Sequence, residues 1–230
     1  MGDVVDIHGG RDPREIPLYS VAEAAGYLSI PASTLRSWVK GQRYRVRGKP
    51  RLFKPLLKAH RTGLLTFNDF VEAYVLASLT RQFALPMARV RLGLDWLGGN
   101  RPLLTQLFQT DGVGLFVERS GKLVDAVKGG QVAIREVLED SLRRVDRDRA
   151  GQPSRVYPWI VDPGERKVVS IDPRRAFGRP TIAARGLTVE VIADRFKAGD
   201  SIDLLTKDYD LSKDQVEVAL RWGLHGAAAA

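Results

Sequence analysis

The chain contains no cysteine among its 230 residues, and it contains only three histidines. Without cysteine, a disulfide framework, a thiolate zinc site and a cysteine nucleophile are all excluded. The histidines are His8, His60 and His225, which lie too far apart in sequence for a paired metal-ligand motif, and no Gly-x-x-x-x-Gly-Lys-Ser/Thr phosphate loop occurs. We therefore expect that the protein is not an enzyme and has no catalytic residues, cofactor or metal.

Long apolar runs are also missing. No stretch is long enough to cross a bilayer, and residues 1–12 carry charged side chains where a signal peptide would be apolar. The lack of cysteine is typical of a reducing compartment. Hydrophobic residues make up 44% of the chain and charged residues 27%, as in folded globular proteins. We expect a folded, cytoplasmic protein.

Acidic residues are absent from one long window. Between Glu23 and Asp69 the chain has none, whereas it has ten basic residues there. The net charge is +9, and the first 63 residues contribute +7 of it. Ten like charges repel one another unless a polyanion balances them, so this window predicts binding to nucleic acid. A solvated basic surface loop is the alternative.

The pattern of a helix-turn-helix runs into this window. Ser20 and Glu23 have the spacing of a capping box, which predicts that a helix starts at Ser20. Residues 28–31 interrupt that helix. A second helix is expected from about Ala32 to Lys40, because Pro31 suits a first turn and Gly41 can end it.

The second of these helices has two chemically different faces. Leu35, Trp38 and Val39 recur at helical spacing and predict a buried face. The opposite face carries hydroxyls and cations without a carboxylate, as a DNA recognition helix requires in order to approach phosphates and base edges. The residues expected to contact DNA from this helix are Ser33, Thr34, Arg36, Ser37 and Lys40. An ordinary helical hairpin on a protein surface would have the same spacing.

A basic β-hairpin is expected next. Residues 43–47 alternate cationic and other side chains with the period of a strand, residues 48–50 can turn the chain, and residues 51–54 can return as a second strand. A hairpin that follows a recognition helix is a wing, which can lie along the sugar-phosphate backbone or enter a minor groove. The phosphate contacts expected from it are Arg43, Arg45, Arg47, Lys49 and Arg51.

Charge is nearly balanced beyond the wing. We expect two core helices, one over residues 69–83 capped by Asn68 and one over residues 86–97. The pattern then predicts a short helix at 103–109, hairpins over 113–127 and 157–171, a helix over 131–145, and a linker or exposed loop at 146–153.

Helix signals return towards the end of the chain. Thr188, Asp200 or Ser201, and Ser212 are the expected starts of three helices, the first of which should bury Val191, Ile192 and Phe196. The charges on this unit are mixed, which favours a protein-contact role over DNA binding. The fold class is therefore mainly α with small β-hairpins, with a winged helix-turn-helix and supporting helices at 1–100, an α+β middle segment at 101–170 and a C-terminal three-helix domain at 171–226.

Two parts of the sequence resemble known families. Residues 19–25 followed by residues 33–38 are similar to the N-terminal part of winged helix-turn-helix proteins of the MerR kind. Residues 177–182, 185–188 and 196–201 resemble a small domain of unknown function that recurs in bacterial antitoxins. In this order the two resemble a long VapB-type antitoxin, whose partner is a VapC ribonuclease toxin of the PIN fold.

The resemblance implies that the chain binds double-stranded DNA at its own operator and holds a toxin inactive. A DNA-binding protein of this architecture is expected to act as a homodimer on a two-fold site. The chain departs from the common small VapB pattern, which has a minimal DNA-binding element and a disordered tail. Two alternatives stay open: a MerR-like, ligand-responsive regulator without a toxin, which would sense its ligand in about residues 101–170, and an RNA-binding or protein-interaction adaptor. The scarcity of aromatic residues disfavours RNA binding.

Overall fold

The structure is a computed structural model that describes residues 10–46, 49–57, 60–82, 87, 90, 91, 139–158 and 167–227. Helices predominate in this part of the chain, and its strands form small antiparallel sheets. The expected fold class is thereby confirmed, with a winged helix-turn-helix near the N-terminus and a three-helix unit near the C-terminus. No helix of the described residues has both the length and the apolar character that a membrane span requires.

The first two α-helices are α1 (Val21–Tyr27) and α2 (Ala32–Lys40), preceded by the 3-10 turn η1 (Pro13–Glu15). The capping box is present: the N–H of Glu23 donates to Ser20 Oγ at 3.1 Å, and the N–H of Ser20 donates to Glu23 Oε2 at 2.9 Å. Ser29 adopts a positive φ of 48° in the turn between the helices. The boundaries of α2 agree with those predicted from the sequence.

Helix α3 (Phe67–Gln82) lies at the centre of the core. It is buried on all sides along residues 70–79, as expected for a helix enclosed by other elements. The prediction that Asn68 caps this helix is wrong. Thr66 is the cap, because its Oγ1 accepts the N–H of Asp69 at 3.2 Å while Asp69 Oδ2 accepts the N–H of Thr66 at 2.9 Å. The Asn68 amide instead donates to Glu15 at 2.5 Å.

The stretch expected to be a linker or exposed loop at 146–153 belongs to a β-hairpin, in which residues 149–151 form an exposed turn. The preceding helix ends at residue 143, and strands β3 (Val145–Arg147) and β4 (Pro153–Val156) pair antiparallel. The Asp148 carboxylate orders the turn by accepting the N–H groups of Ala150 and Gln152, both at 2.9 Å. The elements expected over 103–127, most of the helices at 86–97 and 131–145, and residues 159–166 of the next hairpin lie outside the described residues.

A three-stranded antiparallel sheet, β5 (Val169–Ser170), β6 (Thr181–Ile182) and β7 (Leu187–Thr188), leads into the C-terminal helices. These helices are α8 (Val189–Lys197), α9 (Ile202–Tyr209) and α10 (Lys213–Ala227). Ser201 caps α9, since its Oγ accepts the N–H of Leu204. Ile192 is buried as expected, together with Val189 and Ala193, whereas Val191 and Phe196, also expected inside, are exposed by 37% and 41%.

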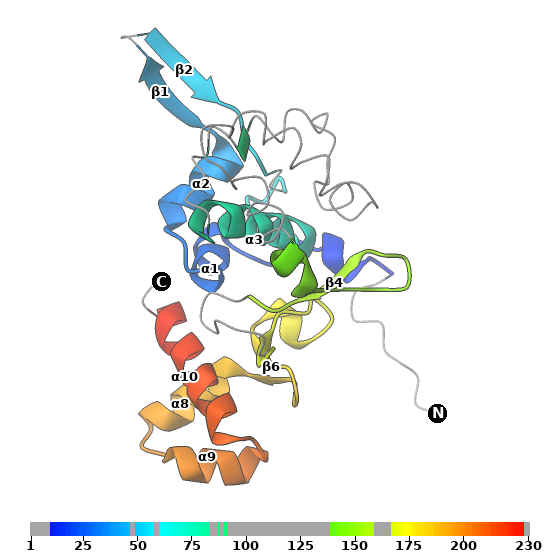
Figure 1. Ribbon diagram of the computed structural model, residues 1–230, viewed down its shortest axis with the longest axis vertical. Coiled ribbons are helices and arrows are strands. Elements are labelled where there is room, and N and C mark those ends of the chain that lie inside the picture. Colours follow the sequence, from blue (N-terminus) through cyan, green and yellow to red (C-terminus); the bar gives the residue numbers. More distant parts are fainter. Residues whose placement is uncertain are drawn as a thin grey trace, which may run out of the picture.

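The N-terminal and C-terminal parts pack on one another. Buried side chains of α1, α2 and α3 belong to the same core cluster as those of α8, α9 and α10. Tyr27 of α1 and Trp222 of α10 form a direct contact in which their ring centroids lie 6.5 Å apart. In Figure 1 the hairpin of β1 (Gln42–Val46) and β2 (Lys49–Phe53) occupies one end of the long axis and α9 the other. This hairpin therefore lies far from α9.

Candidate DNA-binding surface

Helix α2 has the two faces that its sequence predicts. Leu35 and Trp38 are almost completely buried, and Val39 is buried as well. On the other side Ser33, Arg36 and Lys40 are exposed, while Thr34 and Ser37 are half-buried. The Ser37 hydroxyl donates to the carbonyl oxygen of Thr34 at 2.7 Å, so its proton is already used within the helix. Ser33, Arg36 and Lys40 are consequently the side chains of this helix that are most accessible to a ligand.

The end of α2 is joined tightly to the hairpin that follows. Gly41 has a φ of 77°, and a Cβ there would lie 2.5 Å from the carbonyl oxygen of Phe53, so this position requires glycine. The N–H groups of Leu56 and Leu57 donate to the carbonyl oxygen of Trp38 at 2.6 and 3.0 Å. These bonds satisfy the C-terminal end of the helix and fix the base of the hairpin against it.

The hairpin β1–β2 is the wing, defined here as residues 42–53. Its register pairs Arg43 with Leu52 and Arg45 with Pro50, and it pairs Val46 with Lys49. Lys49 thus belongs to the second strand and not to the turn where the sequence predicted it. Strand β2 therefore begins earlier than expected. Pro50 can lie within it because both strands of a two-stranded hairpin are edge strands, which tolerate proline.

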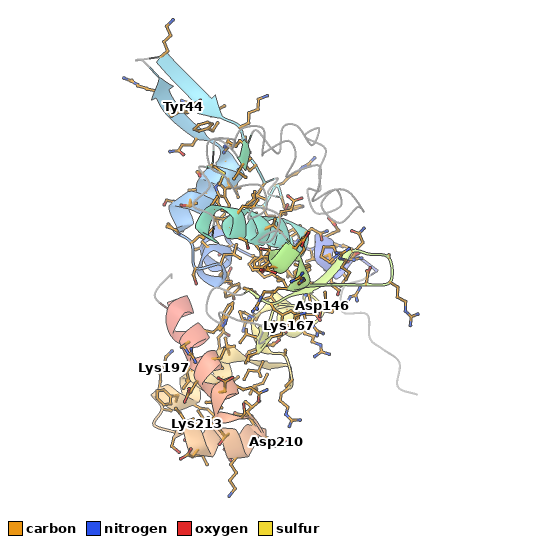
Figure 2. All side chains as sticks on the ribbon, viewed as in Figure 1. Tyr44, Asp146, Lys167, Lys197, Asp210 and Lys213 are labelled. Carbon is orange, nitrogen blue, oxygen red and sulfur yellow. The ribbon has the colours of Figure 1, made fainter. Side chains whose placement is uncertain are left out.

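The cations of the wing are distributed over both of its faces. Because side chains alternate along a strand, Arg43 and Arg45 share a face with Leu52, which is 59% exposed. The other face carries Tyr44 and Phe53, whose rings stack with centroids 3.9 Å apart, and Figure 2 shows Tyr44 in the wing. The register places positions 49 and 51 on the same face as Tyr44. Arg47 lies outside the described residues.

Arg91 contributes to this surface and was not among the residues predicted from the sequence. Its Nη1 donates to the carbonyl oxygen of Lys54, and its guanidinium lies 5.0 Å from the centroid of the Phe53 ring. The residue therefore connects the helical segment around Val90 to the base of the wing. No sequence signal identifies this role, since the contact joins positions 37 residues apart.

Several cations without an ion-pair partner among the described residues lie together on α2 and the wing. Among the described residues none forms an ion pair with the five accessible basic side chains, which are Arg36, Lys40, Arg43, Arg45 and Lys49. Several arginines elsewhere are paired with carboxylates: Arg195, for example, binds Asp200 at 2.5 Å and Asp208 at 2.8 Å. Uncompensated positive charge on a helix and an adjoining hairpin is suited to binding the phosphates of a duplex.

Other polar clusters of the described residues have structural roles. Arg14 joins Asp12 to Asp148 across the chain, with its Nη1 2.7 Å from Asp148 Oδ2. The hydrogen bond from Arg14 holds the pKa of Asp12 below its usual range. No group of three or more histidine, cysteine or carboxylate side chains is arranged to hold a metal ion within the ranges that the structure covers.

A recognition helix followed by a basic wing defines a winged helix-turn-helix protein of the DNA-binding class. Comparison with known families agrees: residues 17–94 match a family described as "Putative DNA-binding HTH domain", and residues 169–222 match one described as "Protein of unknown function (DUF433)". The helix-turn-helix, the wing and Arg91 all fall in the first match.

The chain belongs to the family of the "Putative antitoxin VapB45" of Mycobacterium tuberculosis (strain ATCC 25618 / H37Rv). The two are 32% identical over 227 residues, which covers 90% of this chain and 93% of that protein. A second relative from the same organism, the "Uncharacterized protein Rv2308", is 27% identical and is covered over 89% of its length. The crystal structure of Rv2018 from M. tuberculosis has a TM-score of 0.66 to this structure at 28% identity, covering 90% of this chain and 98% of that one. The resemblance to VapB-type antitoxins is thereby confirmed.

Proposed function

We propose that the protein is a DNA-binding antitoxin of a type II toxin–antitoxin pair. In this proposal it represses its own operon as a homodimer and neutralises a VapC-type ribonuclease toxin of the PIN fold. Residues 1–100 would carry DNA binding, and residues 171–226 would form a domain for protein contact. Membership in the VapB45 family supports the antitoxin role, and the match to a DNA-binding helix-turn-helix family supports the repressor role.

The observation that carries the DNA-binding half is the set of unpaired cations on α2 and the wing. Helix α2 contains no carboxylate and offers Ser33, Arg36 and Lys40, and the wing adds Arg43 and Arg45 next to it. In this arrangement α2 enters the major groove, where its side chains meet base edges, and the wing follows the adjacent backbone. Lys49 adds charge to the same interface, and in this proposal Arg47 and Arg51 are the further phosphate contacts that the sequence predicts.

The proposed homodimer suits the two-fold symmetry of duplex DNA. One helix-turn-helix reads a short half-site, and two copies related by a two-fold axis read a palindrome with half-sites about 34 Å apart or a multiple of that distance. The second copy doubles the number of phosphate contacts. It thereby raises both the affinity and the salt dependence of binding.

The test is a titration of the purified chain with a labelled duplex of its own promoter region, by fluorescence anisotropy at several salt concentrations. Roughly six phosphate contacts give a slope of about −5 in a plot of log K against log salt. A scrambled duplex of equal length is the control, and the promoter should be bound at least about 1,000-fold more tightly. Equal binding to both duplexes, or a slope near zero, would refute operator recognition.

The toxin half is tested with the product of the neighbouring open reading frame. We expect a PIN-fold protein there that degrades RNA when purified alone and is inhibited by stoichiometric amounts of this chain. A neighbour without a PIN fold, or a nuclease that this chain leaves fully active, would contradict the antitoxin role. Either result would leave the operator measurement standing as an independent test of DNA binding.

A further inference from the structure

Phe177 is the most exposed of the large apolar side chains that the structure describes, with 68% of its surface accessible. It sits in the 3-10 turn η2 (Ala176–Gly178), which Figure 1 shows in yellow near β6 and far from the wing. Both Ala176 and Phe177 have positive φ angles, 46° and 53°, and Gly178 follows at 73°. Two successive non-glycine residues in the left-handed region are unfavourable, and such strain concentrates at functional positions.

Buried contacts and hydrogen bonds anchor the turn to the rest of the fold. Gly178 is buried and packs directly against the Tyr19 hydroxyl, where a Cβ would clash. The N–H of Gly178 donates to the carbonyl oxygen of Arg175 at 2.9 Å, and the carboxylate of Asp172 accepts the N–H of Arg174 at 2.9 Å. Asp172 is itself fixed by Arg155 at 3.2 Å. The fold therefore presents the Phe177 ring to solvent on a turn whose base is anchored by these contacts.

Three exposed arginines lie within three residues of Phe177 in the sequence: Arg174, Arg175 and Arg179. Aromatic residues and arginines are enriched in the hot spots that supply most of the binding energy of protein–protein interfaces. The ring would fill an apolar pocket of a partner, and the guanidinium groups would pair with carboxylates on the rim of that pocket. The partner's surface that complements this one would thus be acidic with a hydrophobic centre.

The same features favour a protein over a nucleic acid as the partner. Arg175 lies 3.9 Å from Asp172, and Arg179 lies 3.4 Å from Glu190, so carboxylates accompany two of the three cations. Those carboxylates would repel the phosphates of a nucleic acid. In an interface with a protein, they can instead form ion pairs with arginines or lysines of the partner. Within the part of the chain that the structure describes, the cations of the DNA-binding surface proposed above have no such carboxylates beside them.

We propose that the surface formed by Arg174, Arg175, Phe177 and Arg179 is where the toxin docks, with Phe177 as the anchor in an apolar pocket ringed by acidic residues. This inference rests on the proposed antitoxin function, and it identifies the surface through which the chain would bind the toxin. Because the turn lies away from α2 and the wing, one copy of the chain would hold DNA and toxin at the same time.

The test compares Phe177→Ser, Phe177→Gly and the double variant Arg174→Glu/Arg179→Glu with the unaltered full-length chain. Phe196→Ser is the matched control, since Phe196 is also exposed, by 41%, on the same C-terminal unit. Binding to the purified PIN-fold protein encoded beside this chain is measured by calorimetry, and inhibition of its RNA cleavage is measured in parallel. Operator binding and the melting temperature show whether each variant is folded.

Loss of the anchor should weaken toxin binding by at least about 30-fold, while Phe196→Ser changes it less than about threefold. Operator binding should be unchanged in all variants. Phe177→Gly should melt at the same temperature as the unaltered chain or higher, because glycine accepts a φ of 53° without strain. This variant separates a binding role from a folding role, since a residue retained for stability would lower the melting temperature when removed.

Equal toxin affinity of the Phe177 variants and the unaltered chain would overturn the docking site and leave the antitoxin function intact. Failure of the unaltered chain to bind or inhibit the toxin would overturn both proposals. Binding of a single-stranded RNA oligonucleotide by the unaltered chain that Phe177→Ser abolishes would assign the turn to nucleic acid, and that result also overturns the docking site.

Discussion

Tyr27 of α1 and Trp222 of α10 lie with their ring centroids 6.5 Å apart, and they join the first helix of the DNA-binding unit to the last helix of the chain. Tyr27 also packs edge-on against Phe70 of α3, at 6.4 Å. The three rings connect the C-terminal unit, through α1, to the central helix. Stability of the DNA-binding unit is therefore expected to depend on a residue near the C-terminus.

Replacing Trp222 with alanine should destabilise the whole described fold. The side chain is 4% exposed, and removing a buried aromatic residue costs about 3–5 kcal/mol through lost burial and the cavity left behind. The free energy of unfolding, measured by urea denaturation, should fall by that amount, and operator binding should weaken at temperatures where the variant is partly unfolded.

Trp222→Phe is the matched control for that experiment. Trp222 Nε1 is buried and has no hydrogen-bond partner among the described residues, so phenylalanine keeps a ring at the contact and removes an unsatisfied N–H group. We expect a change below about 1.5 kcal/mol. A cost equal to that of the alanine variant would mean that the indole N–H, and not the ring contact, is what the site requires.

Stability should decline in acid because of the carboxylates around Arg14. Backbone N–H donation from Gln152 lowers the pKa of Asp148, and the hydrogen bond from Arg14 lowers the pKa of Asp12. A carboxyl group with a lowered native pKa stabilises the fold above its unfolded pKa of about 3.9, and this contribution is lost as the pH falls through the native pKa.

Asp148→Asn should therefore reduce the difference between the melting temperatures at pH 7 and pH 3. Most of the reduction should arise from a lower melting temperature at pH 7, because the amide no longer neutralises Arg14. Asp194→Asn, at an exposed helix position, is the control and should leave the pH profile unchanged. If both variants retain the full acid sensitivity, the Arg14 cluster does not govern it.

The helix-turn-helix could be predicted from the sequence because its signals are local. The capping box at Ser20 and Glu23 is closed by bonds between residues three apart, and Gly41 is required by its positive φ directly after α2. Period-2 alternation likewise indicated the wing. Each of these patterns is decided within a few residues, so tertiary packing did not alter the outcome.

The predictions from the sequence failed where contacts between residues far apart in the chain determine the structure. Residues 146–153 have the polar composition of a linker, but Arg14 reaches Asp148 over 134 positions and helps to hold that stretch in a hairpin. Val191 and Phe196 have apolar chemistry that suits burial, yet the packing of α8 against α10 selects Ile192 and Ala193. Arg91 could not be connected to Phe53 before the fold brought them together.

Loss of wing cations should reduce the salt dependence of operator binding. Each phosphate contact contributes about 0.9 to the slope of log K against log salt, so Arg43→Ala/Arg45→Ala should flatten the slope by about 1.8 per chain. Sequence preference should hardly change, because phosphate contacts position the protein without reading bases. Lys213→Ala removes an exposed charge at the start of α10 and should leave the slope as it is. An unchanged slope in the double variant would show that the wing does not contact the backbone.

Arg36 of α2 should govern sequence preference. A guanidinium that donates two hydrogen bonds to a guanine discriminates against other bases by about 1–3 kcal/mol. Arg36→Ala should lose this discrimination in a binding assay over a library of operator variants. Arg36→Lys is the sharper variant, because lysine keeps the charge and lacks the planar pair of donors. It should retain the salt slope and lose the base preference, and retention of both would make Arg36 a phosphate contact. Ser33→Ala should give a smaller effect of the same kind.

Arg91 should affect binding through the wing and not through DNA itself. Its guanidinium lies against Phe53 and donates to the Lys54 carbonyl, so it holds the wing base in place before binding. Without it, the wing must be ordered during binding, and that entropy weakens affinity. Arg91→Ala should lower operator affinity about 3- to 10-fold, the effect of losing about 1 kcal/mol, while the salt slope stays constant. A slope that flattens by about 0.9 would instead mean that Arg91 contacts a phosphate directly, so one salt titration separates a positioning residue from a ligand-contacting one.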